Sequence, residues 1–302
     1  MFRFEVGNAT ATLIPEMIDR SFSFRKFFPK SNDEDVAEHV SWMAPTHYEK
    51  ATGRLLLSMH SWLVDTGKHK ILVDGCVGNH KNRPSRPDWC NLDIPFLQRL
   101  EAAGARPEDI DFVLCTHLHA DHVGWNTKLV DGRWVPTFPN AKYVFSRTEY
   151  EYWDGLLKQQ GQASHHLYSY NDSVLPVVEA GQALIVDDHY VLADCLTLEP
   201  APGHTPGHVA IWLQSKGSTG VFTGDIIHHP IQLIRPGWSC FGCKDQDQAS
   251  TTRLRVLQQC AETNALLFPG HFMQPHAGYV KRHADSFMLH RDGMDLLRKK
   301  EI

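Results

Sequence analysis

The sequence has no long hydrophobic run. No stretch approaches the roughly 20 apolar residues that a membrane-spanning helix needs. The first residues also lack the basic segment, apolar core and small-residue cleavage site of an export signal. We therefore expect a cytoplasmic protein without a membrane partner.

Basic residues are not in excess over acidic ones either. The chain has 30 lysines and arginines against 35 aspartates and glutamates, and its basic runs, such as residues 298–300, are short. Nucleic-acid-binding proteins normally carry a basic stripe, so we expect no nucleic-acid partner. Hydrophobic residues make up 42% of the 302 residues, and no low-complexity linker divides the sequence. This composition predicts a single domain over residues 1–302 with a substantial core.

Cysteine is scarce and mostly isolated. Five of the seven cysteines stand singly, which is typical of reduced thiols in a cytosolic protein. Cys240 and Cys243 form a CxxC pair, for which a redox pair, half of a zinc knuckle and ordinary loop cysteines are the alternatives. Because no second CxxC completes a four-cysteine zinc site, we favour loop cysteines.

The pattern of apolar residues and turns predicts one layout twice. The first half is predicted to have strands at 2–6, 11–14, 55–59, 60–65, 70–73, 112–115 and 143–145 and helices at 92–103 and 148–157. The second half is predicted to have strands at 209–213, 220–223 and 265–268 and a helix at 251–260. Two β-rich halves with helices outside predict the α/β (α+β) class and a four-layer αβ/βα sandwich. We also expect a Phe-rich excursion at about 20–50 and a helical tail from about 276.

One short cluster concentrates metal-binding side chains. His117, His119, Asp121 and His122 form an HxHxDH motif directly after the predicted strand at 112–115. Imidazoles with a carboxylate suit zinc and its first-row neighbours, whereas calcium and magnesium prefer oxygen-rich ligands. The loop after a strand of an open α/β sheet is also where such folds usually bind ligands.

Further candidate ligands stand near other predicted strands. His204 lies in the loop PGHTPGH, just before the strand at 209–213. Asp225 follows the strand at 220–223, and His271 follows the strand at 265–268. His208 and the pair at 165–166 are less favoured: His208 is predicted to support the site or the core, and the pair to be exposed.

These four motifs resemble those of the metallo-β-lactamase superfamily of hydrolases. THLHADHVG, GHTPGH, TGD and PGH occur in that order, and the resemblance runs from about residue 55 to 271. It implies a sandwich of the metallo-β-lactamase type that holds two divalent transition metal ions, zinc first, with manganese, cobalt or iron as alternatives. The implied ligands are His117, His119 and His204 for the first metal, Asp121, His122 and His271 for the second, and Asp225 as a bridge. Asp74 is implied to be a supporting carboxylate beneath the site.

The residues agree with hydrolysis. A bridging carboxylate can hold two cations about 3.5 to 4 Å apart, which yields a bridging hydroxide at neutral pH. Asp121 is the candidate proton carrier to the leaving group, and a role as a ligand alone is an equal alternative. His228 is a candidate hydrogen-bond donor in catalysis, against an equal alternative as a structural histidine.

The substrate is less well specified by the motifs. Trp125 follows Gly124 where glyoxalase II-like and many lactonase-like members have a second glycine. The residues after Asp225 and after His271 resemble the branch of methyl parathion hydrolase and related lactonases and arylesterases. Apolar side chains predicted to line a pocket, although each alone is an ordinary core residue, are Trp125, Trp238, Phe241 and Phe272, together with Phe24, Phe27 and Phe28.

These observations predict a dinuclear metallohydrolase that opens a lactone or cleaves an ester, an aryl ester or a phosphotriester. The expected substrate is a small apolar or aromatic molecule. The basic segment 79–89 would instead suit an anionic group, but we favour a solvated loop there. Alternatives are a β-lactam hydrolase and a mononuclear-iron oxidoreductase similar to persulfide dioxygenases. The aromatic segment 20–30, if exposed, would suit a homodimer contact rather than a pocket.

Overall fold

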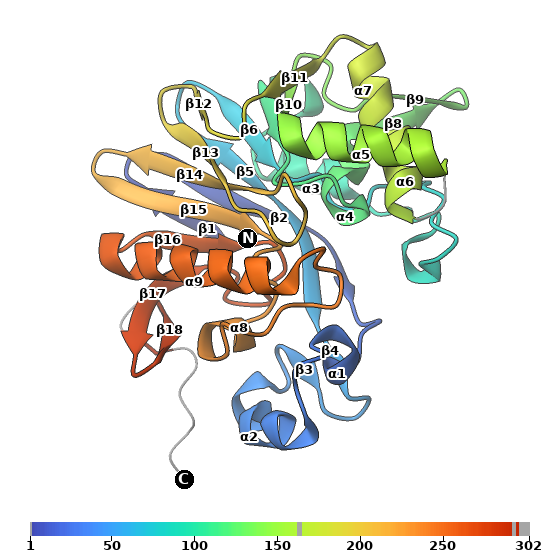
Figure 1. Ribbon diagram of the computed structural model, residues 1–302. Helices are drawn as coiled ribbons and strands as arrows, with labels where there is room; N and C mark the ends of the chain where they lie inside the picture. Colours follow the sequence, from blue (N-terminus) through green and yellow to red (C-terminus); the bar gives the residue numbers. More distant parts are fainter. Residues whose placement is uncertain (1, 162–164, 292–293, 296–302) are drawn as a thin grey trace.

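Two β-sheets form the centre of the molecule (Figure 1). The computed structural model describes residues 2–161, 165–291 and 294–295. The first sheet has the order β1-β2-β5-β6-β7-β10-β11. Its strands are β1 (Arg3–Val6), β2 (Ala9–Asp19), β5 (Leu57–Asp65), β6 (Lys70–Val73), β7 (Phe112–Leu114), β10 (Lys142–Ser146) and β11 (Ala183–Val186).

The second sheet contains the strands of the second half and runs in sequence order from β12 to β19. Its strands are β12 (Tyr190–Leu192), β13 (Leu196–Pro200), β14 (Val209–Ser215), β15 (Ser218–Gly224), β16 (Leu266–Pro269), β17 (Gly278–His283), β18 (Ser286–Arg291) and β19 (Met294–Asp295). Two small hairpins stand apart, β3 (Tyr48–Glu49) with β4 (Arg54–Leu55) and β8 (Thr127–Val130) with β9 (Arg133–Pro136).

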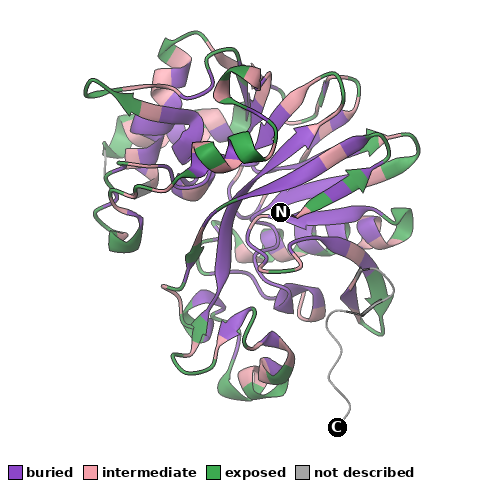
Figure 2. Cartoon of the chain, turned by 180° about the vertical axis from the view of Figure 1, so that it is seen from behind, coloured by how far each residue is buried: buried purple, intermediate pink, exposed green. Residues whose placement is uncertain are grey.

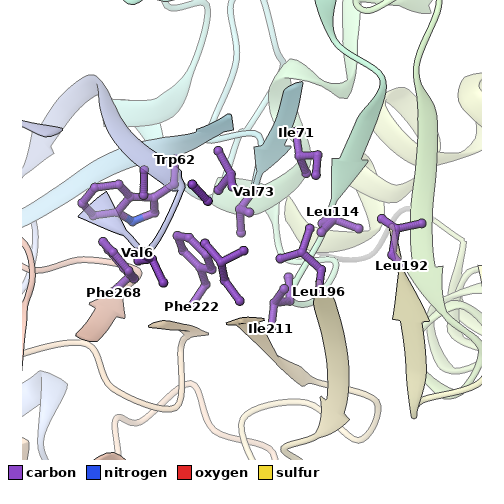
Figure 3. Close-up of a cluster of buried hydrophobic side chains, with 14 of the residues drawn as sticks. Val6, Trp62, Ile71, Val73, Leu114, Leu192, Leu196, Ile211, Phe222 and Phe268 are labelled. Carbon is purple, nitrogen blue, oxygen red and sulfur yellow. The ribbon is translucent and has the colours of Figure 1, made fainter. Parts of the chain in front are cut away.

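The main hydrophobic core lies between the two sheets. Side chains such as Trp62 and Leu114 from the first sheet meet Ile211, Phe222 and Phe268 from the second (Figure 3). Figure 2 shows the consequence, because the central strands are buried while turns and outer helix faces are exposed. Burial of this apolar surface is the main force that holds the sheets together.

Helices cover the outer faces of both sheets. The helices are α1 (Phe24–Phe27), α2 (Asp33–Met43), α3 (Phe96–Ala102), α4 (Ala120–Val123), α5 (Arg147–Gln160), α6 (His165–Ser169), α7 (Leu175–Glu179), α8 (Ile231–Ile234) and α9 (Gln246–Thr263). Helices α3, α5 and α7 pack on the first sheet through residues such as Phe96, Trp153 and Val177. Helix α9 packs on the second sheet through Val256 and Leu257. The predicted αβ/βα sandwich is therefore confirmed.

Local signals account for several element boundaries. The predicted strands at 2–6 and 11–14 are confirmed and form a hairpin, since β1 pairs with β2 in antiparallel register. Helix α5 begins where the Ser146 side chain accepts the Glu149 backbone N–H, so it starts close to its predicted position. Helix α3 begins later than predicted, at Phe96, because Pro95 forms its N-terminal boundary.

The predicted helical tail is wrong. Residues from Gly278 onward form β17 and β18, which extend the second sheet beyond β16 in antiparallel pairing. Phe287, Met288 and Leu289 of β18 are buried in the core cluster of the second sheet. The part of the predicted tail at 292–293 and 296–302 lies outside the described residues. The single-domain organisation stays a prediction.

The Phe-rich excursion packs in a hydrophobic cluster that it shares with later segments, such as Ile231 of α8 and Ala249 of α9. It contains α1, α2 and the β3-β4 hairpin, which lie together at the lower end of the molecule in Figure 1. Phe24, Phe27 and Phe28 are each at most 4% exposed. These three rings therefore do not meet the condition of exposure that a homodimer contact through segment 20–30 would need. Among the described residues, no helix combines the length and the apolar character needed to span a bilayer.

Candidate metal centre

The candidate ligands lie in loops beside strands of both sheets. His117, His119, Asp121 and His122 follow β7 of the first sheet, and α4 carries the last two. Asp225 follows β15 and His271 follows β16, and these two strands are parallel neighbours, so their ends coincide. The loop between β13 and β14 adds the remaining ligand. All seven predicted ligands are thereby brought together, namely His117, His119, Asp121, His122, His204, Asp225 and His271.

The seven side chains form two groups that share one carboxylate. Within each group the potential ligand atoms lie within 4.8 Å of one another. One group consists of His117, His119, His204 and Asp225, and the other of Asp121, His122, Asp225 and His271. This division matches the one that the sequence motifs imply.

Asp225 turns one oxygen toward each group. Its Oδ2 lies 3.1 Å from His204 Nε2 and 3.7 Å from His117 Nε2. Its Oδ1 lies 3.1 Å from His122 Nε2 and 2.9 Å from His271 Nε2. A carboxylate in this position can bridge two cations.

The donor set fits divalent transition metal ions. His117 Nε2, His122 Nε2 and Asp225 Oδ1 are buried and lack hydrogen-bond geometry to any partner in the described part of the chain. Buried polar atoms normally have partners, and imidazole with carboxylate is a ligand set for first-row transition metals. These atoms therefore form a site for divalent metal ions.

The electrostatic environment keeps Asp225 ionised and His117 and His119 neutral, which are the forms that bind metal ions. Burial alone would raise the pKa of Asp225, but four surrounding imidazoles hold it well below its usual range, so the carboxylate is ionised. Burial and neighbouring imidazoles lower the pKa of His117 and of His119, which keeps both rings neutral. Burial opposes protonation of His204 as well, but Asp225 raises the pKa of that imidazole to about 10. A bound cation would have to displace that proton.

Two buried carboxylates hold the ligand loops in place. Asp74 accepts hydrogen bonds from the Thr116 backbone N–H at 2.8 Å and faces His122 Nδ1 at 2.9 Å, so it lies beneath the site as predicted. Glu149 accepts the backbone N–H groups of Leu118 and Gly207, which ties the HxHxDH loop to the loop that carries His204. Sequence reasoning missed Glu149, because nothing in its local sequence marks it.

Comparison with known proteins assigns the family. The model of the metallo-beta-lactamase superfamily matches residues 56–275, which include every candidate ligand. The chain belongs to the metallo-beta-lactamase superfamily. An N-acyl homoserine lactonase of Bacillus thuringiensis is 27% identical over 181 residues, which cover 56% of this chain and 64% of that protein. The lactonase AttM of Azorhizobium caulinodans is 31% identical over 167 residues, 49% of this chain and 56% of that protein.

Solved structures of the superfamily share the fold. The hydrolase AbOPH superposes with a TM-score of 0.79 and 25% identity over 95% of both chains. The dizinc quorum-quenching lactonase AidC superposes with a TM-score of 0.74 and 23% identity over 97% of both chains. The chain spans just under two thirds of the length of the Bacillus relative that it matches.

A cavity of about 250 Å³ opens above the ligands of this superfamily member. Its base, which we call the ligand floor, comprises the seven His and Asp side chains. Its apolar side, which we call the apolar wall, comprises Phe22, Phe27, Leu57, Met59 and Phe241. His119, Asp121, His204, Asp225 and His271 of the floor line the cavity directly. A polar floor and an apolar wall suit a small molecule with one reactive polar group.

Of the seven aromatic residues predicted to line a pocket, Phe27 and Phe241 line this cavity, and Phe241 is 45% exposed. Trp125 lies outside it, because its ring stacks on Phe96 and its Nε1 donates to Glu16. Trp238 packs behind the cavity against Phe24 and Phe28, and Phe272 is fully buried in the core under the second sheet. The expectation that these three line the pocket is wrong, since each meets neighbours that local sequence does not reveal.

The basic segment at 79–89 is not a solvated loop. Lys81 and Arg83 are fully buried and pair with Asp172, with 2.6 Å between Arg83 Nη1 and Asp172 Oδ2. Arg86 lines the cavity, stacks on Trp89 and pairs with Asp19. Lys81 and Arg83 therefore have a structural role, whereas Arg86 and Trp89 reach the cavity.

Three histidines close to the floor differ in how well they were predicted. His208 is buried beneath the floor, and its Nε2 accepts the Asp225 backbone N–H at 3.1 Å, as expected of a supporting residue. His228 Nε2 lies 3.1 Å from Asp225 Oδ2, and the side chain lines the cavity. His166 was expected to be exposed, but its ring stacks on His119 with centroids 3.8 Å apart. Helix α6 places His166 beside His119, and the residue spacing of the HxHxDH motif gives no sign of this contact.

Proposed function

We propose that this chain is a metal-dependent hydrolase that opens lactones or cleaves esters, with acyl homoserine lactones as the first candidate substrates. The observation that carries the proposal is Asp225, which offers one oxygen to each of two ligand groups at the base of an apolar-walled cavity. Two N-acyl homoserine lactonases that are similar to this chain in sequence support a lactone ester as the bond that is cleaved.

The proposed ligands follow the two groups. His117, His119 and His204 would hold the first metal ion, Asp121, His122 and His271 the second, and Asp225 both. Zinc is the proposed ion, because imidazole and carboxylate suit it and the similar structure AidC is described as dizinc. When bound, such ions would supply an acidified water and a Lewis acid for the scissile carbonyl.

Asp121 and His228 are the proposed catalytic side chains. Asp121 lines the cavity, with its Oδ2 3.7 Å from His271 Nε2, so its carboxylate can receive a proton at the floor and deliver it to a leaving oxygen. His228 lines the cavity beside Asp225 and can donate a hydrogen bond from Nε2 to a substrate oxygen. Both side chains would thus contact a substrate bound in the cavity.

The apolar wall is the proposed acyl-chain site. Phe22, Phe27 and Phe241 form an aromatic group whose ring centroids are 5.2 to 6.1 Å apart. Each methylene of a substrate that contacts this wall contributes about 0.8 kcal/mol when fully buried. An aryl ester or an aryl phosphotriester also fits these rings, and activity toward either would refine the substrate class.

A chelator-sensitive substrate panel tests the proposal. Metal-loaded protein is given acyl homoserine lactones, aryl esters, aryl phosphotriesters, β-lactams and glutathione thioesters, with and without a chelator. Lactones or esters should be cleaved fastest, and chelation should stop the reaction until zinc or manganese is returned. Hydrolysis that survives chelation, or no hydrolysis of lactones and esters, would contradict it. A single bound iron with oxygen uptake on a persulfide would establish the oxidoreductase alternative.

We also propose a cytoplasmic location. All seven cysteines are free thiols, and five of them are buried, which is typical of a reducing compartment. Cell fractionation would test it, and recovery of the protein outside the cytoplasm would contradict it.

A further inference from the structure

Two cysteines lie beside the ligand floor. Cys240 and Cys243 follow α8, are 3% and 8% exposed, and have their sulfurs 3.6 Å apart. Both face His204, with Cys243 Sγ 3.5 Å and Cys240 Sγ 3.9 Å from its Nδ1. The sequence indicated ordinary loop cysteines, because the third member of the cluster is 36 residues away.

His204 faces two clusters with its two ring nitrogens. Nε2 points toward Asp225 Oδ2 at 3.1 Å, whereas Nδ1 points toward the two sulfurs. The nitrogen that would serve the first metal site is therefore different from the one that faces the thiols. The cysteine cluster can act without removing Nε2 from the floor.

The spacing of the three atoms fits a tetrahedral metal ion. With Zn–S bonds of about 2.3 Å and Zn–N bonds of about 2.0 Å, tetrahedral angles place two sulfurs about 3.8 Å apart and each sulfur about 3.5 Å from the nitrogen. The structure has 3.6 Å between the sulfurs and 3.5 and 3.9 Å from sulfur to nitrogen. A disulfide, by contrast, needs sulfurs about 2.05 Å apart.

Backbone hydrogen bonds hold the two loops together. The N–H of Lys244 donates to the His204 carbonyl at 2.9 Å, and the N–H of Asp245 donates to the Gly203 carbonyl at 2.9 Å. Cys240 also lines the cavity, so a fourth coordination position would be open to solvent or to a small molecule. His228 Nε2 lies 3.5 Å from Cys240 Sγ on that side. The three donors are therefore arranged before any ion arrives.

We propose that Cys240 Sγ, Cys243 Sγ and His204 Nδ1 form an additional site for a thiophilic metal ion of the zinc and cadmium class, which shares the His204 ring with the first of the two groups around Asp225. Thiolates select such soft or borderline ions over manganese or magnesium. Binding releases to solvent the protons carried by the two thiols and by Nδ1 of His204. When the first metal site is also occupied, the Nε2 proton is lost as well, and the ring bridges the two ions as an imidazolate. The bound ion would fix the His204 loop through Nδ1.

Cadmium titration of the reduced full chain tests this site. Metal-free protein, kept reduced with a phosphine, is titrated with Cd²⁺, and bound cadmium is counted after desalting while thiolate-to-cadmium absorption is followed in the ultraviolet. Cys240→Ser/Cys243→Ser is the test variant, and Cys195→Ser, which removes a half-buried thiol elsewhere, is the matched control.

The wild type and Cys195→Ser should each bind one more cadmium than the double variant and show the thiolate absorption. Equal cadmium counts in all three proteins, or absorption that persists in the double variant, would overturn the proposal. The double variant should still bind metal at the floor, so loss of the additional ion is distinguishable from failure of the proposed hydrolase site.

X-ray absorption of cadmium-loaded wild type gives a second readout that needs no variant. Sulfur should be present among the atoms bound to cadmium, because the seven floor ligands contribute only nitrogen and oxygen. A coordination shell of nitrogen and oxygen alone would overturn the proposal even if the double variant failed to fold.

Discussion

The ligand floor and the apolar wall of the cavity are built from different kinds of sequence. The floor uses short motifs that begin or end at strands, and each motif carries its own ligands within a few residues. The wall is assembled from segments far apart, since Phe27 of α1 meets His228 and Phe241 across about two hundred residues. Chemistry is thus encoded locally in this chain, whereas the shape that selects a substrate depends on long-range packing.

The strongest test of the floor is to neutralise its shared carboxylate. Asp225→Asn should lower bound metal and reduce hydrolysis by more than about 100-fold, the upper range for residues that only support a metal ligand. The cause is the loss of the negative charge that faces both groups. Asp194→Asn, on an exposed turn, is the matched control. Near-normal metal content and rate in Asp225→Asn would show that the two groups do not work as one centre.

A smaller effect is expected one layer beneath the floor. Asp74→Asn replaces the oxygen that faces His122 Nδ1, so the ring loses the partner that orients it. Metal affinity should fall by about 10- to 100-fold, as measured by competition with a chromogenic chelator. Asp111→Asn, which changes a carboxylate near the opposite end of β6, should leave affinity unchanged. Equal affinities in both variants would remove the supporting role of Asp74.

A buried carboxylate on β2 offers a contrast with Asp225. Glu16 lacks surrounding imidazoles, so burial raises its pKa to about 7 despite hydrogen bonds from Val77, Gly78 and Trp125. The folded state therefore holds a proton that the unfolded state releases between about pH 4.5 and 7. This carboxyl makes the protein less stable as pH rises through that range.

Glu16→Gln should therefore gain stability relative to wild type between pH 5 and 8, by roughly 2 to 3 kcal/mol from the size of the shift. Urea unfolding at both pH values measures the difference, with Glu5→Gln on the exposed face of β1 as control. A stability difference that does not change with pH would contradict the assigned shift.

The smallest effect is expected at the wall. Each added methylene of an acyl homoserine lactone should raise kcat/KM up to about fourfold in wild type, the equivalent of 0.8 kcal/mol. Phe241→Ala should flatten this dependence and act mainly on KM, because the residue touches the chain and not the ester. Val191→Ala, at another exposed apolar side chain, should keep the wild-type slope. Parallel slopes in both variants would place the acyl chain elsewhere.

Sequence alone was sufficient for the architecture and for the grouping of the floor residues. Alternating strands, caps and turns predicted the central strands of both sheets and the helices α3, α5 and α9, and the seven predicted ligands do come together. The failures share one physical cause, which is dependence on distant partners. Trp125 was assigned to the pocket but stacks on Phe96 of α3, and the residues after Gly278 pair with β16 instead of forming a helix. The approach of Cys240 and Cys243 to His204 was equally invisible in the local pattern.

The most direct test of the central claim is lactone opening as a function of bound metal. Metal-free protein is loaded with increasing equivalents of Mn²⁺, which thiolates bind poorly, and the opening of an acyl homoserine lactone is measured at each loading. The account predicts that activity rises mainly with the second equivalent. Full activity with a single equivalent, or no lactone opening at any loading, would contradict it.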